Sequence, residues 1–188
     1  MAHVTYKTAT TLDGFIADER NSLDWLFQVD QSSGGPDHES FMTSVGVIVE
    51  GSTTYEWVLR EERLLAEPDR WSQFFGACPT FVFTSRVLPT PDGADVRFVQ
   101  GPVHEALPAI WAAAHGQDVW VVGGGDLAGQ FADVGALDRL IVTIAPVTLG
   151  GGAPLLPRRI ESDRLSLLDV EQCGQFAELT YAVGPPAR

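Results

Sequence analysis

The residues best suited to chemistry in this chain are three consecutive glycines, residues 123–125, placed where an apolar run gives way to a helical pattern. Residues 119–122 read Val-Trp-Val-Val, which is typical of a short buried strand, and Leu127, Ala128 and Phe131 follow at helical spacing. Glycines let a backbone approach another group closely. Free N–H groups at the start of a helix bind anions such as a pyrophosphate. A tight turn without a ligand is the alternative. The spacing is not G-x-G-x-x-G, so the sequence does not support a Rossmann fold.

A second corner of this kind follows the apolar run at residues 45–49. Gly51 and Ser52 come directly after Glu50, and the hydroxyl residues continue into a segment where Thr53 and Glu56 have the spacing of a capping box. Hydroxyl groups at such a position often serve only to cap the helix. Two strand-to-helix corners in one chain nevertheless favour a shared ligand that carries phosphate.

Polar or glycine-containing turns also follow two other apolar runs. Residues 14–17 follow a run at 4–12, and residues 84–86, Thr-Ser-Arg, follow a run at 79–83. In open α/β sheets ligands bind beyond the carboxyl ends of the strands. We therefore expect all four corners to lie near one ligand.

A long polar segment, residues 18–36, carries an apolar cluster that includes Trp25 and Phe27. A loop of this length is more often functional than a simple connector, although the two aromatic side chains could also serve only as anchors to the core. Asp30 follows Trp25 by five residues. Apolar neighbours would raise the pKa of its carboxyl group and suit it to proton donation, while a solvated loop carboxylate is the alternative reading.

Composition excludes several classes of function. The chain has 188 residues, 12 basic against 25 acidic side chains and a net charge of −13, with Lys7 as its only lysine. No basic face is available for a nucleic acid, and no apolar run approaches the roughly 18 residues of a membrane span. The N-terminus has no signal-peptide layout. Cys78 and Cys173 are far apart and the four histidines are scattered, so we expect reduced cysteines, no metal site and a cytoplasmic location.

Hydrophobic periodicity predicts one α/β domain over residues 1–188. Helices are expected at 37–44, 103–114 and from 125 to about 135, and strands at 4–10, 45–49, 79–83, 95–100, 119–122, 140–147, 165–172 and 176–183. The last two strands form a hairpin, while the others alternate with helices. This order favours a mainly parallel twisted sheet, flanked by helices on both faces, with an antiparallel hairpin at one edge.

Because of these corners, the chain resembles the dihydrofolate reductase superfamily. Within that superfamily it is similar to the reductase domain of the bifunctional riboflavin-biosynthesis enzyme and its stand-alone relatives. The matching segments lie in the order of that family and span nearly the whole chain. They read VTxKxAxTLDGxIA at 4–17, GxxTYE at 51–56, VGGG at 122–125, LDxL at 137–140 and TIAPVxLGGG at 143–152.

The resemblance implies a dihydrofolate-reductase-like fold and NADPH-dependent hydride transfer to a pterin-like or ribosylaminopyrimidine-like compound. In this resemblance the glycine corner and the threonine of the second corner bind the pyrophosphate of the cofactor. The first strand and the turn after it flank the nicotinamide ring. The residues expected around the cofactor are Ala9, Ile16, Ala17, Gly51, Ser52, Thr54, Thr84, Ser85, Arg86, Gly123, Gly124, Gly125 and Leu127.

One departure concerns the adenosine 2′-phosphate. Many relatives have Gly-Arg at the second corner, where this chain has Gly51-Ser52 preceded by Glu50, whose charge would repel that phosphate. Arg86 is the nearest candidate replacement. The preference for NADPH over NADH is therefore open.

The substrate is also open between riboflavin-type and folate-type compounds. Lys7 points to the first class, and Asp30 placed five residues after Trp25 points to the second, with Asp30 as proton donor. We expect Lys7, Trp25 and Phe27 to contact the substrate. A protein that binds the cofactor without catalysing a reaction is the alternative. A homodimer is expected from the resemblance, and we expect the apolar strand 141–147 to lie at an exposed sheet edge that supports it.

Overall fold

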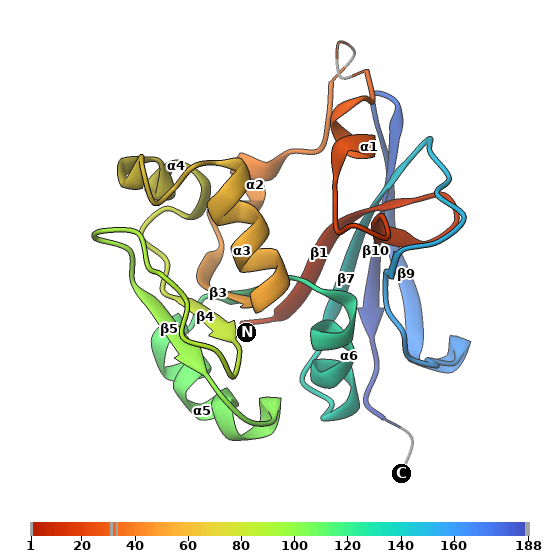
Figure 1. Cartoon of the computed structure of the whole chain (residues 1–188). Helices are drawn as coiled ribbons and strands as arrows, with labels where there is room; N and C mark the ends of the chain where they lie inside the picture. Colours follow the sequence, from red (N-terminus) through yellow and green to blue (C-terminus); the bar gives the residue numbers. More distant parts are fainter. Residues whose placement is uncertain (1, 31, 33, 187–188) are drawn as a thin grey trace.

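The computed structural model describes residues 2–30, 32 and 34–186. Its centre is an eight-stranded sheet in the order β5-β4-β3-β6-β1-β7-β10-β9 (Figure 1). The strands are β1 (Val4–Thr11), β3 (Val45–Gly51), β4 (Thr80–Phe83), β5 (Val96–Val99), β6 (Asp118–Gly123), β7 (Arg139–Ala145), β9 (Leu165–Cys173) and β10 (Phe176–Val183). Two short strands, β2 (Phe15–Ala17) and β8 (Ala153–Pro154), pair separately.

The first six strands of this order are parallel, and the C-terminal hairpin is antiparallel. β1 lies between β6 and β7, with Thr5 opposite Trp120 on one side and Arg139 on the other. β10 pairs antiparallel with both β7 and β9. This arrangement confirms the predicted mainly parallel sheet with an antiparallel hairpin at one edge.

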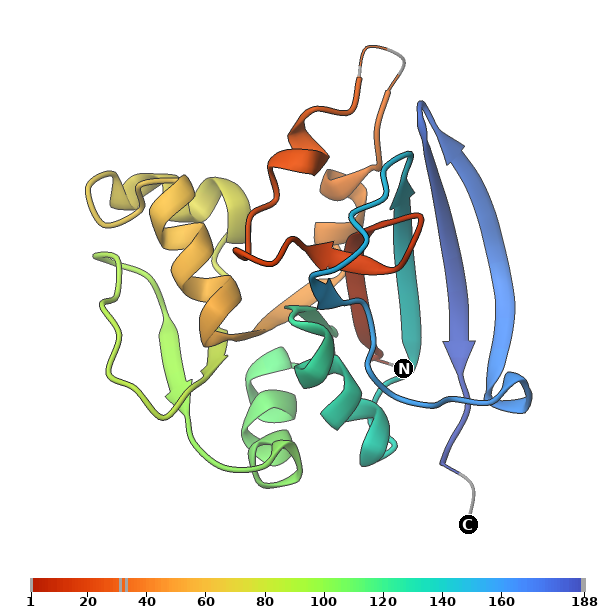
Figure 2. The same ribbon diagram turned by 45° about the vertical axis from the view of Figure 1, so that its right-hand side comes forward.

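Helices cover both faces of the sheet (Figures 1 and 2). The helical segments are α1 (Asp24–Phe27), α2 (His38–Met42), α3 (Ser52–Glu61), η1 (Pro68–Arg70), α4 (Trp71–Phe75), α5 (Val103–Ala114), α6 (Gly125–Asp133) and η2 (Ser162–Arg164). Among the described residues no helix is both long and apolar enough to cross a membrane.

Successive side chains of a strand point to opposite faces of the sheet and pack in different hydrophobic clusters. Val49 of β3 packs with Ile110 of α5 and Phe131 of α6 on one face. Ile48 packs with Tyr55 of α3 and Trp71 of α4 on the other. Each fully buried side chain of this size contributes roughly 1.5–3 kcal/mol to folding. A third, smaller cluster ties α1 to the hairpin through its buried Trp25, which packs with Phe176.

Two local expectations were wrong. α3 begins at Ser52 with Gly51 as N-cap and has no side-chain cap, so Thr53 does not open a capping box. Residues 141–147 do not form an edge, because β7 is paired on both sides, with β1 and with β10.

The exposed edge on that side is β9. Most of its residues are exposed, including Leu167, Leu168 and Val170. An edge strand with unpaired backbone groups and apolar side chains is a surface suited to pairing with another chain.

Candidate functional site

A cleft of about 510 Å³ opens where β3 and β6 end and α3 and α6 begin. Four segments line it: β2, the start of α3, the glycine corner with the start of α6, and the chain around β8. The lining residues are Thr8, Ile16, Ala17, Asn21, Leu23, Gly51, Ser52, Thr53, Thr54, Trp57, Val58, Phe83, Val122, Gly123, Gly124, Gly125, Asp126, Leu127, Gln130, Ala153, Pro154 and Pro157.

Two helix N-termini meet in this cleft. Gly51 is the N-cap of α3 and Gly124 is the N-cap of α6, and neither helix has a side-chain cap. The first N–H groups of each helix therefore have no intrahelical partner. A Cβ added to Gly51 would lie 3.7 Å from the Gly123 carbonyl oxygen, so the two termini are adjacent. Their unpaired N–H groups and aligned dipoles form a site for an anion.

The three glycines of the corner differ in what surrounds them. A Cβ on Gly124 would meet only Ile16 Cδ1, at 3.9 Å, which leaves its backbone open toward the cleft. A Cβ on Gly125 would overlap the carbonyl oxygens of Pro154 and Leu155, so this glycine is needed for packing against β8. The peptide bond between Gly123 and Gly124 is cis. Gly124 is thus the position where a missing side chain leaves room for a ligand.

The remaining wall of the cleft is largely apolar. Ile16 and Ala17 of β2 line one part, and Trp57 and Val58 on the second turn of α3 line another. Apolar walls next to a few converging polar groups are typical of cofactor sites. The anion site and this wall together suit a ligand that has both an anionic group and an apolar part.

A family model supplies the deciding comparison. The model described as "RibD C-terminal domain" matches residues 67–177, more than half of the chain. The chain belongs to the RibD C-terminal domain family.

Related sequences match most of the chain. The sequence is 30% identical to the uncharacterized protein YwjB of Bacillus subtilis, over 92% of this chain and 93% of that protein. It is 26% identical to the riboflavin biosynthesis protein RibD of Mycobacterium tuberculosis, over 80% of this chain but only 44% of RibD. The chain therefore corresponds to part of RibD, and to nearly all of YwjB.

Solved structures of RibD-like proteins show the same fold. A candidate riboflavin biosynthesis protein from Shewanella sp. PV-4 superimposes with a TM-score of 0.77 at 25% identity, covering 97% of this chain and 99% of that chain. Dihydrofolate reductase from Enterococcus faecalis, in complex with NADP(H) and RAB-propyl, has a TM-score of 0.59 at 17% identity, covering 96% of both chains. The dihydrofolate-reductase-like fold predicted from the sequence is confirmed.

The cleft brings together most of the residues expected around the cofactor. Within this RibD-like fold, the predicted residues that line it are Ile16, Ala17, Gly51, Ser52, Thr54, Gly123, Gly124, Gly125 and Leu127. Ala9 is not among the lining residues and packs instead with the cluster around Trp25. Thr84 and Ser85 also lie outside the lining, although Phe83 before them is part of it.

Arg86 is committed to another partner. Its Nη1 donates to Glu56 Oε1 at 3.0 Å, and its Nη2 donates to the other oxygen of the same carboxylate. Arg86 does not line the cleft. The expectation that it replaces the arginine of the RibD relatives for a 2′-phosphate has no support from this placement.

The expectation that the charge of Glu50 repels a phosphate was wrong. Glu50 is fully buried on β3, does not line the cleft, and neither of its carboxylate oxygens has a hydrogen-bond partner among the described residues. Burial raises the pKa of Glu50 to about 8. The carboxyl group is therefore mainly neutral at pH 7.

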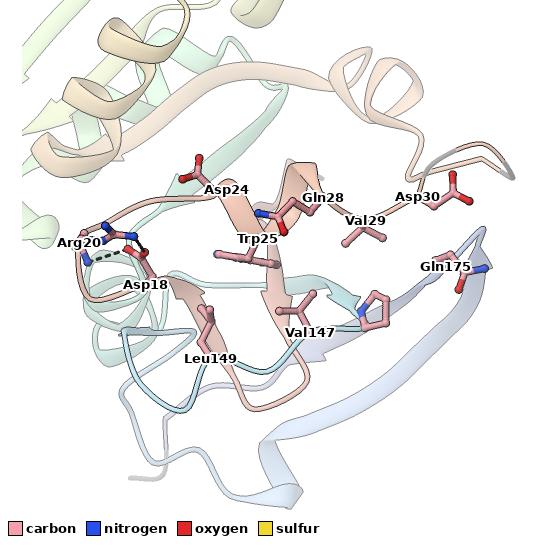
Figure 3. Close-up of a pocket in the computed structure, with 11 residues that line it drawn as sticks. Asp18, Arg20, Asp24, Trp25, Gln28, Val29, Asp30, Val147, Leu149 and Gln175 are labelled. Carbon is pink, nitrogen blue, oxygen red and sulfur yellow. Dashed lines mark hydrogen bonds and ion pairs between the residues drawn. The ribbon is translucent and has the colours of Figure 1, made fainter.

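Asp30 lies away from the cleft, beside a second cavity of about 830 Å³. Figure 3 shows Asp18 and Arg20 at one end of this cavity and Asp30 with Gln175 at the other. Asp30 is exposed, and the Ser32 backbone N–H, which donates to its Oδ1 at 2.8 Å, lowers the pKa of this carboxyl group. The expected rise in the pKa of Asp30 was wrong, because its surroundings are solvent and hydrogen bonds rather than apolar side chains.

Lys7, Trp25 and Phe27, which were expected to contact the substrate, do not lie together in one site. Trp25 of α1 is buried, packs with the cluster that contains Phe176 and lines the second cavity. Lys7 is only 9% exposed, and its Nζ lies 2.8 Å from Glu178 Oε2. Thr143 Oγ1 donates to the same oxygen at 2.7 Å. Phe27 stacks on Trp57 of the cleft wall.

Several residues that line the cleft were not predicted from the sequence. Trp57 and Val58 follow Thr54 by three and four positions, so helical periodicity from Gly51 could have indicated them. Pro154 had no comparable signal, because β8 reaches the cleft only through its pairing with β2.

Proposed function

We propose that this protein is an NAD(P)H-dependent reductase of a pterin-like or ribosylaminopyrimidine-like compound. The observation that carries the proposal is the meeting of two uncapped helix N-termini, at Gly51 and Gly124, beside an apolar wall in one cleft. Membership of the RibD C-terminal domain family supports the same activity.

Each part of the cleft has a separate role in this proposal. The N–H groups that follow Gly51 and Gly124 bind the pyrophosphate, and Thr54 adds a hydroxyl group beside them. Ile16 and Ala17 orient the nicotinamide, and Trp57 keeps water from the reacting face. A dihydronicotinamide held there would supply a hydride to the carbon of a C=N bond of the substrate, and the nitrogen of that bond would take a proton from outside the cofactor.

The proton is best supplied by water. Asp126 is the one carboxyl group in the described lining of the cleft. The side-chain amide of Gln130 donates to it at 3.0 Å, and this hydrogen bond, with a further contribution from Arg158, lowers the pKa of Asp126. A carboxylate of this kind is a poor acid at neutral pH.

A binding protein without catalysis is the second candidate. It is favoured by the state of Lys7, whose ammonium group is paired with Glu178 and lies outside the cleft lining. Either candidate could form a homodimer, which we propose through β9 rather than β7.

The test is oxidation of NADPH followed at 340 nm with a small panel of dihydropterins and ribosylaminopyrimidines. Oxidation that depends on one of these compounds is the expected result for a reductase. Tight NADPH binding without oxidation for any compound in the panel would favour the binding protein.

A further inference from the structure

The side chains of Phe27 and Trp57 reach toward each other from two different helices. Phe27 is the last residue of α1, and Trp57 lies on the second turn of α3. Their ring centroids are 6.2 Å apart and their planes differ by 6°. In Figure 1, α1 lies near the top of the view and α3 lies to its left. The stacked pair therefore bridges two segments that are distant in the chain.

The pair stands at the cleft. Trp57 lines it, and so does Leu23, the residue that precedes α1. Both segments therefore contribute residues to the lining of the cleft, while Phe27 lies outside that lining and next to Trp57.

Phe27 contributes little to the core. Its side chain is 62% exposed, whereas Trp25 is 7% exposed and anchors α1 to the cluster that contains Phe176. Residues two apart on a helix point in nearly opposite directions. An exposed phenylalanine held parallel to a tryptophan leaves a large aromatic surface open to a ligand.

The lining also lacks cationic side chains. Among the described residues, no Lys, Arg or His lines the cleft, and its one carboxylate, Asp126, is already paired with Arg158 at 3.0 Å. The backbone site at Gly124 is the place for the cofactor pyrophosphate. A phosphate group on the substrate would therefore find no cationic side chain in this lining.

We infer that Phe27 and Trp57 form an aromatic clamp that selects a flat, uncharged nitrogen heterocycle without a phosphate group. The inference rests on the proposed function and narrows its substrate class. A third ring sandwiched between two others needs them roughly 7 Å apart, twice the optimal carbon–carbon distance of about 3.5 Å. The Phe27 and Trp57 rings are already parallel, with centroids 6.2 Å apart, so a movement of α1 that widens the gap between their planes to this distance admits the ring.

The experiment is calorimetric titration of 6-hydroxymethylpterin, its phosphate monoester and 5,6-diaminouracil into the protein, with and without saturating NADPH. Phe27→Ala should weaken binding of the unphosphorylated pterin by about tenfold or more, as expected for loss of a stacking partner. Phe27→Tyr should bind within about threefold of wild type, because it keeps the ring. Leu65→Ala, which shortens another exposed apolar side chain, is the matched control and should not alter binding.

Trp57→Phe and Trp57→Ala extend the test, with a thermal melt to establish that each is folded. Pterin affinity should follow the order Trp, Phe, Ala at position 57. Affinity for NADPH should change less than twofold in Phe27→Ala, because Phe27 does not line the cofactor cleft.

Unchanged pterin affinity in folded Phe27→Ala would overturn the clamp, as would failure of wild type to bind either heterocycle. Tighter binding of the phosphate monoester would overturn the selection against phosphate. These failures differ from failure of the proposed function, in which NADPH does not bind or is not oxidised while the heterocycles still bind at the clamp.

Discussion

Gly51 and Gly124 lie so close together that a Cβ on Gly51 would be 3.8 Å from the backbone nitrogen of Gly124. Each is the N-cap of a helix without a side-chain cap. Two corners separated by more than seventy residues in the chain thus form one backbone surface. An anion there is held by N–H groups and helix dipoles, which suits a chain with a net charge of −13 and one lysine.

Glu50 should make the stability of the protein depend on pH. Its folded pKa of about 8 lies above the ordinary value of 4.5, so the folded state binds the proton more tightly than the unfolded state. The contribution of Glu50 to the free energy of unfolding is therefore greatest below pH 4.5 and falls as pH rises toward 8. The slope from this group is about 1.4 kcal/mol per pH unit.

Urea denaturation of wild type and Glu50→Gln between pH 5 and 8 checks this dependence. The variant should lose most of the slope, while Glu105→Gln, on the exposed face of α5, should keep it. Parallel pH profiles for wild type and Glu50→Gln would show that Glu50 does not hold a proton in the folded state.

Asp30 is expected to be dispensable for turnover. It is exposed, its pKa is lowered by the Ser32 N–H, and it borders the second cavity instead of the cleft. A positioned acid contributes roughly 10²- to 10⁴-fold in rate. Asp30→Asn should keep at least about a third of wild-type turnover on a C=N substrate. A hundredfold fall with unchanged NADPH affinity would restore Asp30 as the proton donor.

Wild-type protein should discriminate weakly between NADPH and NADH. Arg86 is paired with Glu56, and the described lining contains no basic side chain for a 2′-phosphate. Ser52→Arg should shift the ratio of the two dissociation constants toward NADPH by about tenfold or more, since a charged hydrogen bond contributes about 1.5–3 kcal/mol. Ser85→Arg, outside the lining, is the control. A wild-type preference above about a thousandfold would contradict this expectation.

β9 should form the interface of a homodimer. Leu168 and Val170 are more than half exposed on this edge strand. Light scattering at micromolar concentration is expected to give a dimer for wild type and a monomer for Leu168→Lys with Val170→Lys. Val134→Lys, an exposed position at the end of α6, should remain dimeric. A wild-type monomer would exclude the interface.

Local patterns predicted the elements and the glycine corners well. The run before Gly123 and the helical spacing after it are features of adjacent residues, so β6 and the start of α6 could be predicted without tertiary information. The order of those elements then favoured a parallel sheet, in which the ends of β3 and β6 lie at one edge.

Properties that depend on distant partners could not be predicted. The pairing of Arg86 with Glu56 joins residues thirty positions apart. Glu50 lies in a strand that helices cover on both faces, so the alternation of apolar and polar residues cannot indicate an exposed side. In addition, the register of the pairing with β6 shifts between Val49 and Glu50. Asp30 follows Trp25 closely in the chain, but only the loop conformation determines that its carboxyl group faces solvent.

The most direct test of the account is calorimetric titration of NADPH into wild type and Gly124→Val. The open space at Gly124, where an added Cβ would meet only Ile16 at 3.9 Å, should allow the variant to fold while its side chain fills the pyrophosphate site. Wild type should bind NADPH, and Gly124→Val should bind at least about a hundredfold more weakly, with an unfolding transition close to wild type. Ala112→Val, on the exposed side of α5, should bind like wild type. Unchanged NADPH affinity in folded Gly124→Val would contradict the assignment of this cleft to the cofactor.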